Sequence, residues 1–115
     1  MADSTVERLV REYFLAYERK DRSALESLLH ADFSFASPHD PHLETVAYFE
    51  RCWPNSAYSV QFKIRKLFVH GDEAFVLYDC TTTSGSVFCN AEFFRIADAK
   101  ISSIQVFYGA LPTAK

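Results

Sequence analysis

The chain has 115 residues, of which 49% are hydrophobic, and this is enough for one domain over residues 1–115 with a single core. Its formal net charge is −3 and no basic run exceeds a dipeptide, so the electrostatic signature of a nucleic-acid-binding protein is missing. No stretch of about 18 apolar residues occurs and the N-terminal MADSTVER is polar, so we expect neither a membrane span nor a signal peptide.

The cysteines and the aromatic residues narrow the class further. Cys52, Cys80 and Cys89 are odd in number and form no C-x-x-C spacing, so we interpret them as reduced thiols in a cytoplasmic protein. A reactive thiol is the alternative, although no basic partner is visible in the sequence. The eleven Phe, six Tyr and one Trp exceed what a minimal core needs, and they either build a bulky core or line a cavity.

The N-terminal part predicts two helices. Ser4 and Glu7 form a capping box, and apolar residues then recur at i, i+3, i+4 spacing, which predicts a helix over residues 5–20. Asp21 or Ser23 is expected to cap a second, shorter helix, which carries three leucines at helical spacing.

A strand and a third helix are predicted next. Alternating residues over 33–37 predict a short strand that ends at Pro38. Asp40 and Pro41 have the order of a helix start, with aspartate as the cap and proline at the first helical position. Helical spacing of apolar residues continues from there to Pro54.

The rest of the chain predicts four antiparallel strands joined by hairpins, over residues 58–69, 73–82, 87–96 and 100–108. In the first of them, alternation predicts one shared face for Tyr58, Val60, Phe62, Ile64 and Phe68. The tail from Leu111 to Lys115 is expected to be loose. Helices on one face of such a sheet make an α+β fold, and a strongly curved sheet of this kind leaves a conical cavity.

The chain resembles the nuclear transport factor 2-like superfamily and, within it, the SnoaL-like domains. The resemblance is carried by the order of three segments, AYERKDRSALESLLHADFSF, FASPHDP and FFRIADAKISSIQVFYG. It implies a cone-shaped α+β fold in which a curved mixed or antiparallel sheet wraps around three helices from the N-terminal half. It also implies an apolar interior and a homodimer formed through the outer sheet faces. Members include isomerases, cyclases, dehydratases, hydrolases and non-catalytic binding modules, so the fold does not decide the function.

Ketosteroid isomerase is the member whose chemistry can be compared by position, and it is a worked example of pKa tuning in the general literature of enzyme mechanism. By resemblance, Tyr13 matches its oxyanion-binding tyrosine and Glu92 falls at its protonated acid, with one extra methylene. Ser37 occupies the place of its proton-transferring aspartate. Serine cannot be that base at neutral pH without a partner, so the isomerase mechanism is not supported as a whole, whereas the oxyanion-binding half is retained.

Strand alternation assigns a direction to the acid. If Glu92 faces inward, Phe88, Asn90, Phe94 and Ile96 face inward with it, and Phe93 faces outward. By resemblance, Ile104, Val106 and Tyr108 also face inward and Phe107 outward. Phe93 and Phe107 would then need a cover, which agrees with a dimer through the sheet.

Each catalytic candidate has a structural alternative. Glu92 is either a desolvated acid with a raised pKa, or a structural carboxylate paired with Arg95, or an exposed strand residue. Tyr13 either polarises a ligand oxygen or packs in the core. Ser37, His39 and Asp40 are weaker candidates near the cavity mouth, since neighbours in a tight loop seldom align as a relay and Asp40 is expected to cap a helix.

Further residues are expected to line the pocket: Tyr17, Phe35, Tyr48, Phe49, Trp53, Phe62, Tyr78, Asn90, Phe94, Val106 and Tyr108. A metal site at His39, Asp40 and His42 lacks a third histidine at ligand spacing, so we expect no metal and no cofactor.

Two functions of different class remain open. One is a cofactor-free isomerase or lyase that acts on a small apolar molecule bearing a carbonyl or hydroxyl, with Tyr13 and Glu92 polarising the oxygen. The other is a non-catalytic module of the same fold that binds a ligand or only dimerises. Ser37, where the isomerase has its base, favours the second, whereas an acid among aromatic residues favours the first.

Overall fold

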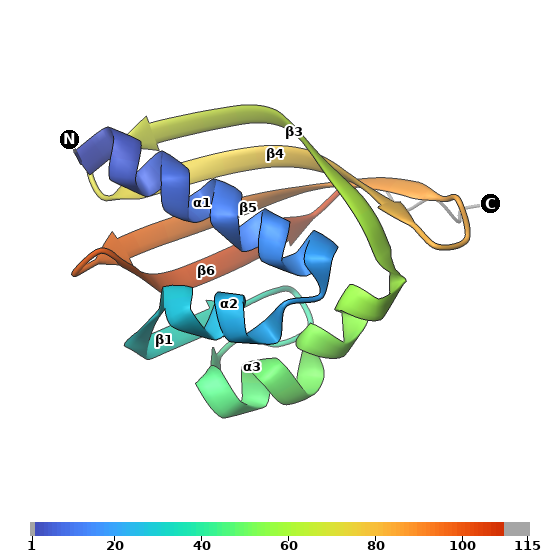
Figure 1. The fold of residues 1–115 in the computed structure, drawn as a ribbon, viewed down its shortest axis with the longest axis horizontal. Helices are drawn as coiled ribbons and strands as arrows, with labels where there is room; N and C mark the ends of the chain where they lie inside the picture. Colours follow the sequence, from blue (N-terminus) through green and yellow to red (C-terminus); the bar gives the residue numbers. More distant parts are fainter. Residues whose placement is uncertain (1, 110–115) are drawn as a thin grey trace.

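The structure, a computed structural model, describes residues 2–109, so the predicted loose tail from Leu111 lies outside the described residues. Three helices and a six-stranded sheet make up the fold (Figure 1). In chain order the elements are α1 (Ala2–Arg19), α2 (Arg22–Leu28), β1 (Leu29–Ala36), β2 (Leu43–Glu44), α3 (Thr45–Arg51), the 3₁₀ helix η1 (Trp53–Tyr58), β3 (Ser59–His70), β4 (Glu73–Thr82), β5 (Val87–Ala97) and β6 (Lys100–Tyr108). None of the described helices combines the length and the apolar character needed to cross a bilayer.

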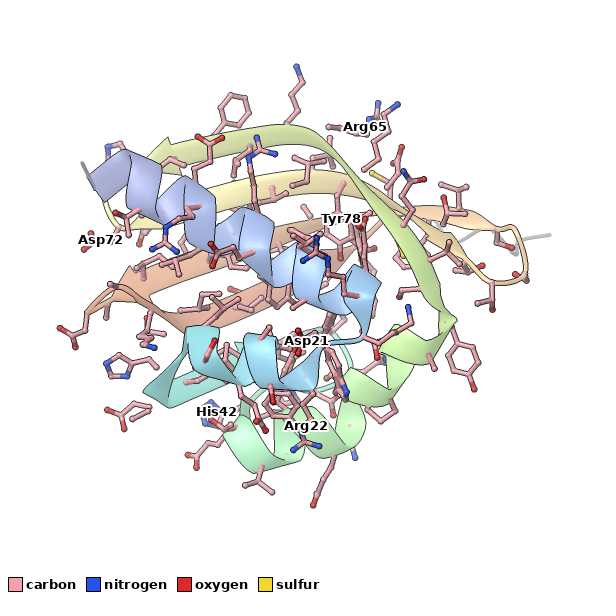
Figure 2. All side chains as sticks on the ribbon, viewed as in Figure 1. Asp21, Arg22, His42, Arg65, Asp72 and Tyr78 are labelled. Atoms are coloured by element: carbon pink, nitrogen blue, oxygen red, sulfur yellow. The ribbon has the colours of Figure 1, made fainter. Side chains whose placement is uncertain are left out.

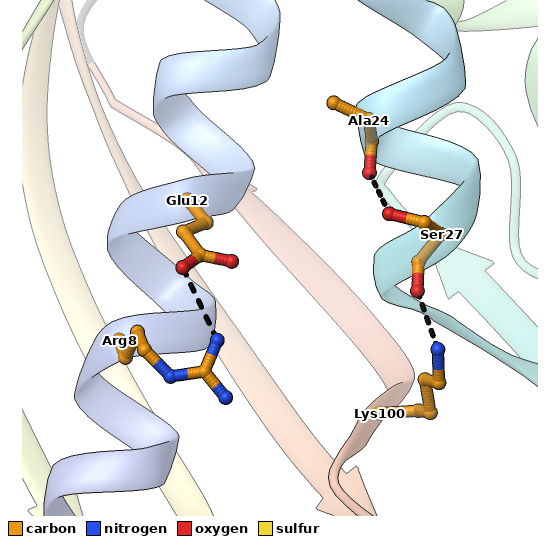
Figure 3. A network of polar contacts seen from close by, with 5 residues as sticks. All are labelled: Arg8, Glu12, Ala24, Ser27 and Lys100. Atoms are coloured by element: carbon orange, nitrogen blue, oxygen red, sulfur yellow. Dashed lines mark hydrogen bonds and ion pairs between the residues drawn. The ribbon is translucent and has the colours of Figure 1, made fainter.

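Helix α1 buries one face and exposes the other. The buried side chains on it include those of Val6, Leu9, Val10, Tyr13, Phe14 and Ala16. Its exposed face carries i,i+4 ion pairs, among them Arg8–Glu12 at 3.1 Å (Figure 3). The helix begins at Ala2, so the predicted start with Ser4 as the cap is wrong, and Ser4 lies in the first turn. Adding residues to a helix that packing already stabilises costs little, which explains the earlier start.

Helix α2 is fixed at both ends. Of the two predicted caps, the structure selects Asp21, whose Oδ1 accepts a hydrogen bond of 3.0 Å from the backbone N–H of Ala24 (Figure 2 labels Asp21). At the other end, Nζ of Lys100 donates to the carbonyl oxygen of Ser27 at 2.6 Å (Figure 3). This contact ties the end of α2 to the start of β6.

The sheet is mixed and open, with strand order β2-β1-β6-β5-β4-β3. Strand β1 pairs parallel with β6 and every other pair is antiparallel. Helix α1 crosses the concave side next to β3 and β4, while α2 and α3 cover the β1 side (Figure 1). The core lies between the helices and this concave face, which confirms the predicted cone-shaped α+β fold.

The turn between β5 and β6 is strained at its second residue. Asp98 and Ala99 both have positive φ, 54° and 58°, as the two central residues of a type I′ hairpin turn require. An alanine in this left-handed conformation carries a steric cost that a glycine does not.

The segment before α3 corrects two predictions. Strand β1 begins at Leu29, not at residue 33, because it already pairs with β6 there, before an irregularity in the register. The prediction that Asp40 caps a helix starting at Pro41 is wrong. Leu43 first pairs with Phe35 to form β2, and α3 begins only at Thr45. The strand pair takes up the residues that the Asp-Pro pattern would have used as a helix start.

Strand β3 inverts part of its predicted face. Phe62 and Ile64 pack against the core as predicted, but Phe68 is 66% exposed, and Tyr58 and Val60 are exposed as well. The pairing of β3 with β4 shifts register between Ser59 and Gln61 and again between Ile64 and Lys66. Because one extra residue exchanges the two faces of a strand, Leu67 and Val69 take the inner positions beyond the second shift.

The outer face of the sheet carries a group of phenylalanines, which we call the outer aromatic patch: Phe68, Phe75, Phe93 and Phe107. The ring centroid of Phe75 lies 5.0 Å from that of Phe93 and 6.4 Å from that of Phe107. The outward direction predicted for Phe93 and Phe107 is therefore confirmed, and Phe68 joins them because of the shift in β3.

Candidate functional site

A cavity of about 130 Å³, which we call the inner cavity, lies between α1, η1 and the concave face of the sheet. It is lined by Tyr13, Phe14, Tyr17, Phe35, Cys52, Asn55, Ser56, Ser59, Phe62, Tyr78, Phe88, Glu92, Val106 and Tyr108. Aromatic rings supply most of this wall, and Glu92 is its only acidic residue. A larger groove of about 540 Å³ between β1 and α3 lies on the surface, and Glu92 is not among its lining residues.

Glu92 is directed inward by the alternation of β5, as predicted. Buried and more exposed residues alternate along the strand from Asn90 to Ile96, and the Glu92 side chain is only 4% exposed. Its Oε2 accepts a hydrogen bond of 2.5 Å from the hydroxyl of Tyr78, which extends from β4 toward the side covered by α1 (Figure 2 labels Tyr78). Its Oε1 is buried and has no hydrogen-bond partner among the described residues. Arg95, the alternative partner, pairs with Glu73 at 2.7 Å on the outer face.

Burial sets the protonation of this carboxyl. Loss of hydration raises the pKa of Glu92 from 4.5 to about 7, and the hydroxyl groups of Tyr78 and Tyr13 oppose part of that rise. A carboxyl with a pKa near 7 can both donate and accept a proton under ordinary conditions. Since Oε2 is engaged by Tyr78, the oxygen available to a ligand is Oε1.

A second set of hydrogen bonds, made by Asn90 of β5, supports Tyr78. Nδ2 of Asn90 donates to the Tyr78 hydroxyl at 3.4 Å, and Oδ1 of Asn90 accepts from the backbone N–H of Gly109 at 3.1 Å. A Cβ atom on Gly109 would lie 1.9 Å from the carbonyl oxygen of Cys89, so only glycine permits this approach. The carboxyl, Tyr78 and Asn90 are thus held together by the ends of β5 and β6.

Three tyrosines approach the site from the helices. Tyr13 and Tyr17 on α1 line the inner cavity, and the hydroxyl of Tyr17 is hydrogen-bonded to that of Tyr48 on α3. Burial raises the pKa of all three phenols above 10, so they remain protonated at neutral pH and serve as hydrogen-bond donors. Tyr13 also packs edge-on against Phe94 with ring centroids 5.2 Å apart, so it contributes to the core and to the cavity wall.

A wider hollow of about 410 Å³, which we call the vestibule, adjoins the inner cavity. Its wall is formed by His39, Asn55, Tyr58, Ser59, Thr82, Phe88, Asn90 and Tyr108. The two hollows share Asn55, Ser59, Phe88 and Tyr108. The ring centroids of His39 and Tyr108 lie 5.4 Å apart. His39 therefore lies in the vestibule wall beside Tyr108, one of the residues shared by the two hollows.

The other candidates at the mouth have structural partners. The hydroxyl oxygen of Ser37 accepts hydrogen bonds from the backbone N–H groups of His39 and Asp40, at 3.3 and 3.2 Å. The carboxylate of Asp40 pairs with Arg51 at 2.7 Å. His42 lies 3.6 Å from Glu44, on the exposed side of this segment. Of the predicted mouth residues, only His39 lines a hollow.

Some of the residues that were predicted to line the pocket do so in the structure, and others pack behind its wall. Lining residues that were predicted are Tyr13, Tyr17, Phe35, Phe62, Tyr78, Asn90, Glu92, Val106 and Tyr108. Four others, Tyr48, Phe49, Trp53 and Phe94, pack in or against the core behind this wall. Eight further lining residues were not predicted from the sequence: Phe14, Cys52, Asn55, Ser56, Tyr58, Ser59, Thr82 and Phe88. The alternation of β5 already placed Phe88 inward, whereas η1, which supplies Asn55 and Ser56, gave no periodic signal.

Comparison with known proteins agrees with this geometry. The family model of the SnoaL-like domain matches residues 10–104. A candidate ketosteroid isomerase from Kribbella flavida DSM 17836 is similar in structure, with a TM-score of 0.79 and 19% identity over 94% of this chain and 80% of that chain. An epoxide hydrolase of the LEH-like type from M. tuberculosis has a TM-score of 0.77 and 14% identity, over 93% and 84% of the two chains.

A third similar structure is a nuclear transport factor 2-like protein of unknown function from Cytophaga hutchinsonii ATCC 33406. Its TM-score is 0.73 and its identity 21%, over 90% of this chain and 89% of that chain. No curated protein matches the sequence. At these identities the solved structures establish the fold alone.

Proposed function

We propose that this chain, which belongs to the family of SnoaL-like domains, binds a small, mostly apolar molecule with one carbonyl or hydroxyl oxygen and moves a proton on it without a cofactor. The observation that supports the proposal most is the buried Oε1 of Glu92, which has no partner among the described residues and belongs to a carboxyl that lines a cavity. An unsatisfied buried oxygen is costly in a folded protein, and a ligand that bonds to it removes the cost.

Size restricts what enters the inner cavity. An apolar cavity of about 150 Å³ in another protein holds benzene, so a cavity of about 130 Å³ admits a group of roughly five or six non-hydrogen atoms. The vestibule, at about 410 Å³, is within the range of ordinary ligand sites and would hold the rest of the molecule.

The proposed chemistry is that of an isomerase or lyase. Protonated Glu92 and the phenol of Tyr13 would donate to the ligand oxygen and stabilise the negative charge that develops on it as a proton leaves the neighbouring carbon. His39, which lines the vestibule, is the group that we propose to accept that proton and to return it at another carbon. Ser37 and Asp40, with partners of their own, would hold the loop that carries His39.

Turnover of a panel of enolisable ketones and epoxides tests this proposal. In Glu92→Gln we expect kcat/KM to fall by about 100-fold or more, because an amide is a weaker hydrogen-bond donor to the developing oxyanion than a carboxylic acid. Glu50→Gln, which changes an exposed glutamate of α3 away from the site, is the matched control and should retain the rate. Equal rates for wild type and Glu92→Gln on every substrate that is turned over would contradict the catalytic role.

A non-catalytic binding module is the second candidate. It is favoured by Ser37, whose hydroxyl is engaged in the turn, and by an inner cavity with a single carboxyl. Native mass spectrometry of gently purified protein would then show a retained small molecule whose release accompanies the Glu92→Gln substitution. Binding of panel compounds without any turnover would support this candidate over the enzyme.

We also propose that two copies associate through the outer aromatic patch. Phe68, Phe75 and Phe107 are 66%, 47% and 43% exposed, and a second copy would bury these rings from water. In sedimentation experiments the double variant Phe75→Ser, Phe107→Ser should be a monomer, whereas Val46→Ser, at an exposed site on α3, should behave as the wild type. A wild type that sediments as a monomer would contradict the proposal. The three free thiols fit the reducing conditions of the cytoplasm, which is the location we propose.

A further inference from the structure

We propose that the inner cavity also accepts the protonated head group of a small alkylamine, with the carboxylate of Glu92 as its counter-ion and the surrounding rings as its apolar contacts. This ligand class differs from the neutral molecule proposed above in its charge. It uses the same carboxyl in its ionised form, whereas polarisation of a ligand oxygen uses the protonated form.

The charge inside the cavity favours a cation. Its wall contains one carboxyl and no Lys, Arg or His, so an ionised Glu92 has no opposite charge beside it within the part of the chain that the structure describes. The ammonium of Lys20, outside the cavity, is exposed and donates at 2.5 Å to the backbone carbonyl of Ser59, a residue of the cavity wall. A buried carboxylate without a partner is unfavourable, and an ammonium ligand would supply one.

The other titratable groups that face Glu92 are neutral at ordinary pH. They are Tyr13 and Tyr17 from α1, Tyr48 from α3, Cys52 at the end of α3, and Tyr78 and Cys80 from β4, and burial raises the pKa of each of them. The Cys52 thiol, for example, has its pKa raised to about 11. His39 lies apart in the vestibule. Glu92 therefore carries the charge change of the inner cavity near neutral pH.

Geometry favours a primary or secondary amine. Tyr78 engages Oε2, so Oε1 is free to accept one N–H from the ligand. Around it the rings form a nearly continuous wall, in which the centroid of Phe14 lies 4.8 Å from that of Tyr78 and 5.3 Å from that of Phe62. Aromatic rings attract cations that have lost part of their hydration. A four-carbon amine fills the inner cavity, and a longer tail would extend past Phe88 and Tyr108 into the vestibule.

Isothermal titration calorimetry with n-butylamine, 1-butanol and butyrate tests this inference at pH 8.5 and pH 5.5. Fluorescence of Trp53 provides a second readout, because this single tryptophan packs against Tyr17 at a centroid distance of 4.9 Å. At pH 8.5 we expect butylamine to bind about tenfold or more tightly than butanol, and butyrate not to bind. At pH 5.5 the preference for the amine should be lost, because Glu92 is then neutral while an aliphatic amine keeps its proton.

Variants assign the effect to Glu92. In Glu92→Gln we expect the amine preference to disappear while butanol still binds, whereas Glu50→Gln should keep the preference. The pH dependence should persist in His39→Gln, since that histidine lies outside the inner cavity. Equal binding of butylamine and butanol by wild type at pH 8.5 would overturn the inference and leave the oxygen-binding proposal intact. If neither compound binds, both are wrong. The wild-type comparison stands even if a variant fails to fold.

Discussion

Replacing Glu92 with glutamine should remove a loss of stability that the wild type shows as pH rises from 4.5 to about 7. The pKa of this carboxyl is about 7 in the folded protein and 4.5 in a solvated chain. Between these two values the folded state holds the proton that the unfolded state has lost, so unfolding releases a proton. The free energy of unfolding therefore falls as pH rises from 4.5 to 7 and is constant outside that window. A glutamine at this position has no such proton.

The size of the effect follows from the two pKa values. A difference of this extent corresponds to about 3 kcal/mol in the free energy of unfolding, and most of it falls between pH 5 and pH 8. Glu92 is only 4% exposed, so solvent screening reduces this figure little. Contributions from other titrating groups are common to both proteins and cancel in the difference between them.

Urea unfolding followed by Trp53 fluorescence at pH 5 and pH 8 measures the effect. The difference in unfolding free energy, Glu92→Gln minus wild type, should increase by roughly 2–3 kcal/mol from pH 5 to pH 8. For Glu50→Gln, an exposed site, the corresponding difference should not change with pH. A pH-independent difference for Glu92→Gln would show that the carboxyl ionises as freely in the folded state as in water, and the account of the site would then be wrong.

Three further substitutions probe the surroundings. Tyr78→Phe removes the donor to Oε2 and should raise the pKa of Glu92 by about one to two units, seen as a shift of the same stability window to higher pH. Ala99→Gly should stabilise the protein by about 0.5–1 kcal/mol in thermal unfolding, because φ is +58° there, and a loss of stability would contradict the strain. Gly109→Ala should destabilise it by about 1–3 kcal/mol, since the new Cβ would meet the Cys89 carbonyl, and an unchanged melting temperature would contradict that close approach.

Strand alternation was sufficient to predict the direction of the main candidate. Strand β5 is paired on both sides without a shift from Asn90 to Arg95, so its two-residue period holds and Glu92 and Phe94 fall inward. The apolar face of α1 was predictable for the same reason, because a regular helix keeps its period. The fold followed from the order of such regular elements.

Where the backbone is irregular, the sequence did not predict the element bounds or the directions of the side chains. The two shifts in β3 exchange its faces, and no residue type in VQFKIRKLF marks where they occur. Asp40 and Pro41 have good local propensity for a helix start, but the pairing of Leu43 with Phe35 is a strand contact that helix-capping patterns do not include. Ser37 is bonded by backbone N–H groups of its own loop and Asp40 by Arg51 at the end of α3, so the sequence alone could not show that both side chains are engaged.

The protonation of Glu92 in the folded protein is the most direct test of this account. Carbon-13 NMR of the glutamate side-chain carboxyl groups, with the Glu92 signal assigned by its absence in Glu92→Gln, follows that protonation as a function of pH. The account predicts a titration midpoint of about 7. A midpoint near 4.5, the value of a solvated glutamate, would contradict it.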